Sequence, residues 1–325
     1  MFKYLYLTLV ILVVGCFNLQ GQDPQFTQFY SNPLYQAPSF AGAVEGYRAS
    51  LNYRDQWPSL PGKVTTVSFA MDYNMSDLNS GIGIFAMKDN VGSSNLSSLN
   101  LGILYSYNVK IHRKVFFGPG VGFYYTQRSL DFNSLNFYGD PNLSGTKPIE
   151  ASEIDDVQAA DASVSGLLFI GNVSSGFTVD HLITPNIAFT DLANKLPMKY
   201  TLFGGYRFYK LERLIGAVRQ SVTIVGTYKH QGAADQLDMG MYWSYEPFSI
   251  GVWYRDLPFI KDYSSRDAIA VLLGYKYKGL SVGYSYDFTV SRFITNTGGA
   301  HEISLIYKFE VEYKKKFKPI PCPEF

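Results

Sequence analysis

The clearest structural signal in this chain of 325 residues is the stretch 99–110, which reads LNLGILYSYNVK. Its odd-numbered positions, from Leu99 to Val109, are all apolar or aromatic. Its even-numbered positions are Asn, Gly, Ser or Lys, except for Leu104. Because successive side chains of a β-strand point to opposite faces, this period of two predicts a strand with one apolar face.

The same alternation recurs along most of the chain, for example in residues 47–54, 66–73 and 301–309. We expect about fourteen strands, most of them about 9–11 residues long, which is the length that crosses a bilayer as a tilted strand. Their expected spans are 46–54, 64–73, 80–88, 98–110, 114–127, 162–171, 174–182, 199–209, 220–230, 236–245, 247–256, 267–277, 279–288 and 300–310. An even number of strands allows a closed antiparallel barrel with both chain ends on one side.

The composition excludes several other classes of protein. Charged residues make up only 17% of the chain, against about 25% in a soluble domain, and aromatic residues reach 16%. A disordered chain would not carry so many aromatic residues. The net charge of +1 gives no sign of a nucleic-acid-binding protein, and two cysteines cannot form a disulfide framework. Only the first 16 residues approach the ~20 apolar residues that a membrane-spanning helix needs.

The connections between the expected strands fall into two groups. Long connections such as Arg128–Asp161 and Thr289–Gly299 alternate with short ones such as Ile111–Arg113. Long loops on one rim and tight turns on the other are typical of outer-membrane barrels. Two connections depart from this rule, because Gln231–Asp235 is short where a long loop is expected and Lys210–Arg219 is long where a turn is expected.

A soluble β-sandwich is the alternative fold. It would bury the apolar faces and present a charged exterior. Here the polar faces are poor in charge, and the apolar faces carry many tyrosines near strand ends, as in aromatic girdles at a membrane interface. We therefore predict an all-β transmembrane barrel whose last strand pairs with its first, since no backbone group can stay unpaired in lipid.

The N-terminus is typical of an export signal, with Lys3 before an apolar run from Leu5 to Gly15. Cleavage near Gly21 and lipidation of Cys16 at a lipobox are two open alternatives, and a core helix is a third. We divide the chain into a signal peptide (1–21), an N-terminal periplasmic or plug segment (22–45), the barrel (46–310) and a basic C-terminal tail (311–325). The second of these is rich in Pro, Phe and Gln and does not alternate.

Several charged residues lie on the polar phase of the expected strands or at its ends. We predict that they face the lumen, where arginines and acids pair, because a charge facing lipid at the midplane would cost about 2–4 kcal/mol. The candidates are Arg48, Arg54, Asp72, Arg207, Arg255 and Asp287. A lumen plugged and held by ion pairs and a selective pore are both compatible with this pattern.

No motif for catalysis or a cofactor is present, so we expect neither an enzyme nor a metal site. His301 and Glu302 point to opposite faces of a strand, and the remaining histidines lack metal-binding spacing. The acidic cluster in the longest loop (Glu150, Glu153, Asp155, Asp156 and Asp161) could bind Ca²⁺ weakly or could simply be solvated.

The C-terminal tail is a candidate for contacts with a partner. It contains Lys314, Lys315, Lys316 and Lys318, followed by Cys322. The lysines could dock on an acidic partner or on lipid headgroups, or they could remain solvated.

Motifs spread over the whole mature chain resemble those of the PorP/SprF family. They are residues 22–29 (QDPQFTQF), 53–58 (YRDQWP), 179–182 (VDHL), 204–208 (GGYRF), 283–287 (GYSYD), 299–307 (GAHEISLIY) and the ending 322–325 (CPEF). The resemblance implies an outer-membrane protein of the type IX secretion and gliding systems of Bacteroidota. It further implies periplasmic secretion or motor components and a secreted surface protein as partners. The alternative function is a diffusion channel or a small-molecule transporter.

Overall fold

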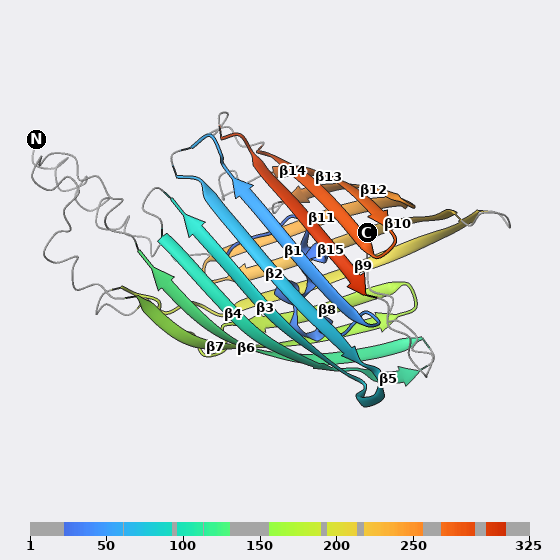
Figure 1. Cartoon of the computed structure of the whole chain (residues 1–325), viewed down its shortest axis with the longest axis horizontal. Helices are drawn as coiled ribbons and strands as arrows, with labels where there is room; N and C mark the ends of the chain where they lie inside the picture. The colour runs from blue at the N-terminus through green and yellow to red at the C-terminus, as the bar shows by residue number, and fades with distance from the viewer. Residues whose placement is uncertain are drawn as a thin grey trace, which may run out of the picture.

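The computed structural model describes residues 23–60, 62–92, 96–112, 114–130, 156–189, 194–212, 218–255, 268–289 and 297–309. These residues form one antiparallel sheet that closes on itself (Figure 1). The strands are β1 (Tyr47–Gln56), β2 (Val64–Met75), β3 (Ser80–Val91), β4 (Leu96–Tyr107), β5 (Val109–His112), β6 (Val115–Ser129), β7 (Val157–Ile170), β8 (Val173–Asp180), β9 (Lys199–Glu212), β10 (Val218–Gln231), β11 (Ala234–Tyr245), β12 (Phe248–Arg255), β13 (Ala268–Tyr277), β14 (Leu280–Thr289) and β15 (Ala300–Phe309).

The barrel has fourteen strands. Fifteen are labelled, but β4 and β5 occupy one position in the wall, because both pair with β6 and only Asn108 separates them. The last strand pairs with the first along its full length, from Tyr47 opposite Phe309 to Gln56 opposite Ala300. The predicted fold is therefore confirmed.

The two rims of the barrel differ as the sequence predicts. One rim carries the long connections and is called here the long-loop rim. The short-turn rim is closed by tight turns such as Gly171–Asn172 and Lys278–Gly279, in which Gly171 and Lys278 have φ values of +61° and +52°. The prediction of a long connection at Lys210–Arg219 is wrong. There β9 continues to Glu212 and pairs with the start of β10 at Val218, and the two strands extend past their neighbours (Figure 1).

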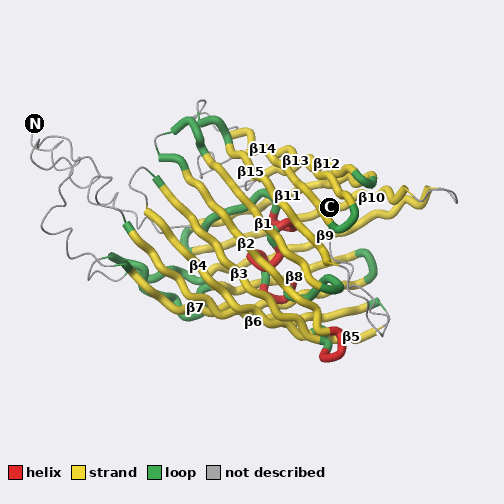
Figure 2. The backbone as a smooth tube through the Cα atoms, viewed as in Figure 1, coloured by secondary structure: helices red, strands yellow, loops and turns green. Residues whose placement is uncertain are grey.

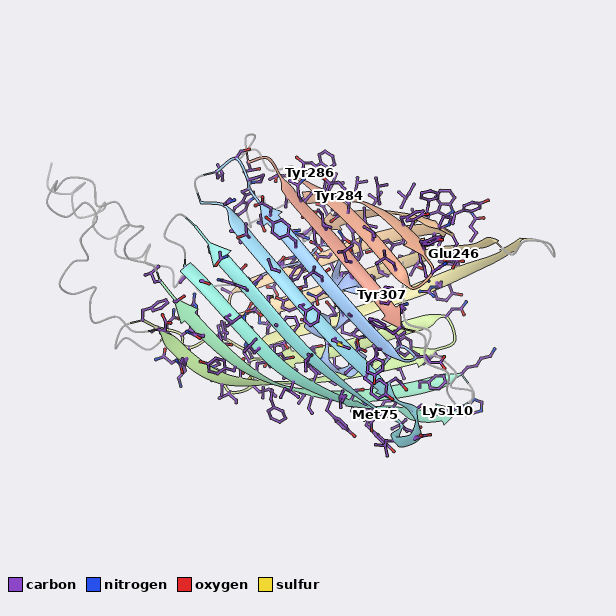
Figure 3. The ribbon with its side chains drawn as sticks, viewed as in Figure 1. Met75, Lys110, Glu246, Tyr284, Tyr286 and Tyr307 are labelled. Carbon is purple, nitrogen blue, oxygen red and sulfur yellow. The ribbon has the colours of Figure 1, made fainter. Side chains whose placement is uncertain are left out.

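The outer face of the barrel is apolar along every strand. Leu51, Ile103 and Phe123 are 42%, 69% and 66% exposed, an arrangement that only a lipid solvent favours. Figure 3 places Met75 and Lys110 at the short-turn rim and Tyr284 nearer the opposite rim. Among the described residues, no helix is both long and apolar enough to cross a membrane.

Residues 23–45, called here the inner segment, lie inside the barrel (Figure 2). The segment forms three short helices: η1 (Phe29–Ser31), α2 (Pro33–Gln36) and η2 (Pro38–Phe40). Proline starts two of them, where its fixed φ suits a first helical turn and its missing N–H has no partner to lose. A further 3-10 helix, η3 (Ser76–Leu78), lies at the short-turn rim.

The inner segment accounts for large apolar residues that point inward and break the simple alternation. Leu104 is fully buried and shares an apolar cluster with Leu34 and Phe40 of the segment. Trp253 and Leu272 pack with Phe29 in a second cluster on the opposite part of the wall. Apolar side chains are favoured at these inward positions because they pack against the inner segment and do not face water.

The inward face combines buried Ser, Thr and Asn side chains with buried charges. Many charged side chains are buried there, because the polar groups of the inner segment require partners in the lumen. They include Arg48, Arg54, Asp72, Asp89, Asp161, Asp238, Asp287 and Glu302.

Candidate functional site: the anchored inner segment

The inner segment contacts the barrel wall through a dense set of hydrogen bonds and ion pairs. Backbone approach is close enough to require glycine in the wall. A Cβ on Gly120 would lie 2.3 Å from the Ser39 nitrogen, and a Cβ on Gly81 would lie 2.1 Å from the Ala41 oxygen. Any larger residue at these positions would push the segment away from the wall.

The middle of this contact is the Thr27 cluster, formed by Thr27, Arg54, Arg255, Asp287 and Glu302. Glu302 is fully buried, and its two carboxylate oxygens accept the backbone N–H groups of Thr27 (2.8 Å) and Gln28 (2.9 Å). The Thr27 hydroxyl donates to Asp287 (2.8 Å) and accepts from Arg54 (2.8 Å) and Arg255 (2.9 Å). One side chain of the segment thus joins two cations and an anion of the wall.

Charges in the Thr27 cluster balance. Arg54 donates to Asp287 at 2.7 Å and to Glu302 at 3.0 Å, and Arg255 reaches Asp287 at 3.4 Å. These groups come from β1, β12, β14 and β15, which are far apart in sequence but close together across the barrel seam. Two arginines and two carboxylates buried together leave no net charge, which makes their burial tolerable.

A second ion pair holds the C-terminal end of the segment. Arg48 binds Asp72 through two parallel hydrogen bonds of 2.8 and 3.0 Å, the bidentate geometry that favours arginine over lysine. Arg48 also donates to the Phe40 carbonyl, and Asp72 accepts from the Gly42 N–H at 2.8 Å. Gly42 has a φ of +61°, which only glycine adopts readily.

The N-terminal end of the segment is held by the Asp23 cluster: Asp23, Asp161, Asp180, His181 and Lys199. Asp23 accepts from Lys199 (2.6 Å) and contacts His181 Nε2 (2.9 Å), while His181 Nδ1 lies 2.5 Å from Asp161. Lys199 also reaches Asp180 at 3.2 Å. Since both ring nitrogens face carboxylates, the imidazole must carry two protons to donate to both.

Electrostatics agree with this protonation. Burial opposes a charge on His181, but the carboxylates of Asp23 and Asp161 outweigh it and raise the pKa of His181 to about 10. Burial also opposes the charged form of Asp23, which would raise its pKa. The positive charges of Lys199 and His181 outweigh this effect and hold the pKa of Asp23 well below its usual range. His181 lies just beyond the end of β8 and has a φ of +60°, a conformation that few side chains adopt without tertiary support.

The family of this chain can be read from a sequence comparison. The profile described as "Type IX secretion system membrane protein PorP/SprF" matches residues 18–307, which is most of the chain. The chain belongs to the PorP/SprF family. It is an outer-membrane β-barrel protein.

Comparison with curated protein sequences finds no significant match. Solved structures with a similar fold include outer membrane protein Omp33 of Acinetobacter baumannii, at 8% identity and a TM-score of 0.46, covering 82% of this chain and 100% of that one. A variant of the TodX monoaromatic hydrocarbon channel has 12% identity and a TM-score of 0.46, covering 85% and 93%. A variant of the Rhodopseudomonas blastica porin has 9% identity and a TM-score of 0.36, covering 82% and 99%.

The predicted lumen residues occupy different places in this PorP/SprF barrel. Arg48 and Asp72 form one pair, and Arg54, Arg255 and Asp287 belong to the Thr27 cluster. Arg207 lies on the inward phase of β9 close to the short-turn rim, where its backbone N–H donates to the Asn172 carbonyl. It is therefore far along the wall from the Thr27 cluster.

Other predicted positions lie outside the described residues. They are the signal peptide with Cys16, most of the acidic loop, and the tail with Lys314, Lys315, Lys316, Lys318 and Cys322. The described residues contain no group of three or more His, Cys, Asp or Glu side chains arranged to hold a metal ion.

Sequence reasoning missed the role of four residues at the site. Glu302 and His181 were considered as metal ligands and set aside, and Asp23 and Lys199 were not singled out. The inward phase of β15 could have indicated Glu302, because a carboxylate among Ser304 and Ile306 on that face needs a partner. No local signal could have paired Asp23 with His181, which is 158 positions away.

Proposed function

We propose that this PorP/SprF protein is a closed barrel of the type IX secretion machinery that supports export or anchoring of surface proteins through protein–protein contacts. The observation that carries this proposal is the inner segment, which is buried in the lumen between two apolar clusters and the charge-balanced Thr27 cluster. A lumen occupied in this way is poorly suited to bulk diffusion of solutes. The protein would then act mainly through contacts that other proteins make with its two rims.

The orientation of the barrel supports the same proposal. In outer-membrane barrels the short turns face the periplasm and the long loops face the exterior. The extended β9–β10 ribbon and the basic tail that follows β15 would then meet periplasmic components. The long loops would meet a secreted surface protein.

Planar-bilayer recording of the purified protein tests the closed lumen. We expect no steady conductance from the full-length chain. A variant that lacks residues 23–45 serves as the open comparison if its heat-modifiable migration shows a folded barrel. A steady, ohmic conductance of the full-length chain would instead support the alternative function, a diffusion channel or small-molecule transporter.

Affinity purification from crosslinked cells tests the protein contacts. We expect periplasmic secretion or motor components and a surface protein to copurify with the full chain. A matched variant in which Lys314, Lys315, Lys316 and Lys318 are replaced by Gln asks whether the tail contributes. Absence of any such protein from the full-chain sample, with the barrel folded and in the outer membrane, would contradict the proposal.

A further inference from the structure

A cavity of about 370 Å³ lies between the inner segment and the wall at the long-loop rim. Its volume is within the range of small-molecule binding sites, roughly 300–1,000 Å³. Strands β3, β4 and β6 form one side of it, and the loop after β8 contributes Ile187 and Leu196. The floor is formed by Asp23, Pro24 and Tyr35 of the inner segment, so the cavity ends where the segment fills the lumen.

Most charges that line this cavity are already paired. Asp23, Asp161, Asp180, His181 and Lys199 bind one another in the Asp23 cluster. They form a polar boundary at one end of the cavity and have little capacity left for a ligand.

Two lining charges have no ion-pair partner among the residues that the structure describes. Asp89 is 7% exposed, and its carboxylate accepts only the Thr66 hydroxyl, at 2.6 Å. Arg128 donates to the Ile187 carbonyl at 3.3 Å and lies 5.8 Å from the Phe189 ring centroid. Two opposite charges that line an enclosed cavity without ion-pair partners are costly to bury, unless another molecule pairs with them.

The register of the sheet fixes the spacing of these charges. Asp89 on β3 is opposite Ser98 on β4, and Ser98 is opposite Arg128 on β6, so the three residues form one row across the wall. Neighbouring strands are ~4.8 Å apart, which puts the Asp89 and Arg128 backbones about 10 Å apart. Ser98 is small, so the space between the two charged side chains is open to a polar group that carries both signs of charge.

An apolar wall lies beside this charged row. Phe85 and Met87 precede Asp89 on the inward phase of β3, and Leu96, Ile187 and Leu196 complete the wall. A ligand complementary to the cavity therefore has an ammonium for Asp89, a carboxylate for Arg128 and an apolar body.

We propose that this cavity binds a small zwitterionic molecule with apolar side groups, of the class of a short apolar peptide with free ends. The ammonium and carboxylate of an extended dipeptide are about 7 Å apart, because each residue spans ~3.3–3.6 Å. That length fits between two side chains that reach inward from positions about 10 Å apart. The proposal concerns the cavity outside the inner segment and does not depend on whether the lumen below it conducts.

The test is a binding measurement by titration calorimetry on the full-length protein in a nonionic detergent. The probes are the dipeptide leucyl-phenylalanine, its N-acetylated form and its C-terminal amide. We expect the free dipeptide to bind, and each blocked form to bind on the order of tenfold more weakly, because each lacks one charge-assisted hydrogen bond. Failure of the free dipeptide to bind at millimolar concentration, or equal binding of all three probes, would overturn the proposal.

Variants assign each end of the ligand. Asp89→Asn should abolish the preference over the N-acetylated form and keep the preference over the amide, and Arg128→Gln should do the reverse. Ser98→Leu should weaken binding of the free dipeptide, because the larger side chain fills the space between Asp89 and Arg128. Asp235→Asn lies outside the cavity and should leave binding unchanged. Heat-modifiable migration checks that each variant is folded. Binding unchanged in folded Ser98→Leu, or preferences unchanged in the charge variants, would place the ligand elsewhere and overturn the assignment.

Discussion

The outer and inner faces of the same barrel wall are organised by different neighbours. On the outer face Ile103 is 69% exposed and belongs to a continuous apolar surface, whereas the next residue, Leu104, is fully buried against the inner segment. Both residues are aliphatic, but Ile103 contacts lipid whereas Leu104 contacts the inner segment. Each strand thus contacts lipid on one face and protein on the other. Only the lipid environment is the same for every strand.

The inner face is also where charge concentrates. Lipid excludes charge from the outer face, but the inner face holds the Thr27 cluster, the Arg48–Asp72 pair and the Asp23 cluster, each of which fixes one part of the inner segment. We infer that the outer face determines that the chain forms a barrel, and that the inner face determines that the lumen is occupied.

Removing one charge from the Thr27 cluster should have the largest effect. Arg54→Met leaves Asp287 and Glu302 with too little positive charge in a buried site, which typically costs 3–5 kcal/mol (roughly) in the free energy of unfolding. Reversible urea unfolding of the reconstituted barrel measures it. Lys110→Met, at the exposed end of β5, is the matched control and should change little. A loss of under ~1 kcal/mol for Arg54→Met would mean that the cluster does not hold the segment.

The next effect concerns the apolar contact. Leu104→Ala should lower the free energy of unfolding by about 2–5 kcal/mol, because it removes buried methyl groups and leaves a cavity beside Leu34. Leu104→Met nearly conserves volume and should cost less than about 1.5 kcal/mol. The same unfolding assay compares the two. Equal stability of the wild type and Leu104→Ala would indicate that the inner segment does not pack on this side chain.

A charge on the outer face tests the lipid-facing assignment. Ile103→Lys should cost about 2–4 kcal/mol if the residue lies near the bilayer midplane, and less nearer an interface. Ile103→Leu should be close to neutral. Unfolding in lipid bilayers is the appropriate measurement, and a neutral Ile103→Lys would place this part of β4 outside the membrane.

The smallest predicted effect is a pH dependence. The pKa of His181 is raised from its usual 6.5 to about 10, so the stability that its pairing contributes is fully present below about pH 6.5 and is lost as the pH rises through about 10. Heat-modifiable migration at pH 7 and pH 10.5 should show a lower transition temperature at the higher pH. In His181→Gln this difference should be smaller. An identical pH dependence in both proteins would show that His181 is not charged in the fold.

The sequence predicted the barrel wall much better than its contents. Lipid imposes the same apolar requirement on every strand, so alternation located all fourteen strands. The need to pair every backbone group in lipid then predicted that the last strand pairs with the first. The inner segment lacks such a signal, because helices of three or four residues show no periodicity. Its partners are also remote, as in the hydrogen bond from Ser304 to Gln28 across 276 positions. The arginines could be placed on the inward phase, but their acidic partners and the role of Thr27 depend on that remote contact.

Limited proteolysis with chymotrypsin tests most directly whether the inner segment occupies the lumen. The segment contains Phe26, Phe29 and Phe40, all nearly fully buried, which are cleavage sites for this enzyme. We predict that residues 23–45 stay intact, as read by mass spectrometry, until heating unfolds the barrel. Cleavage at these phenylalanines while the barrel still migrates as a folded species would contradict the account.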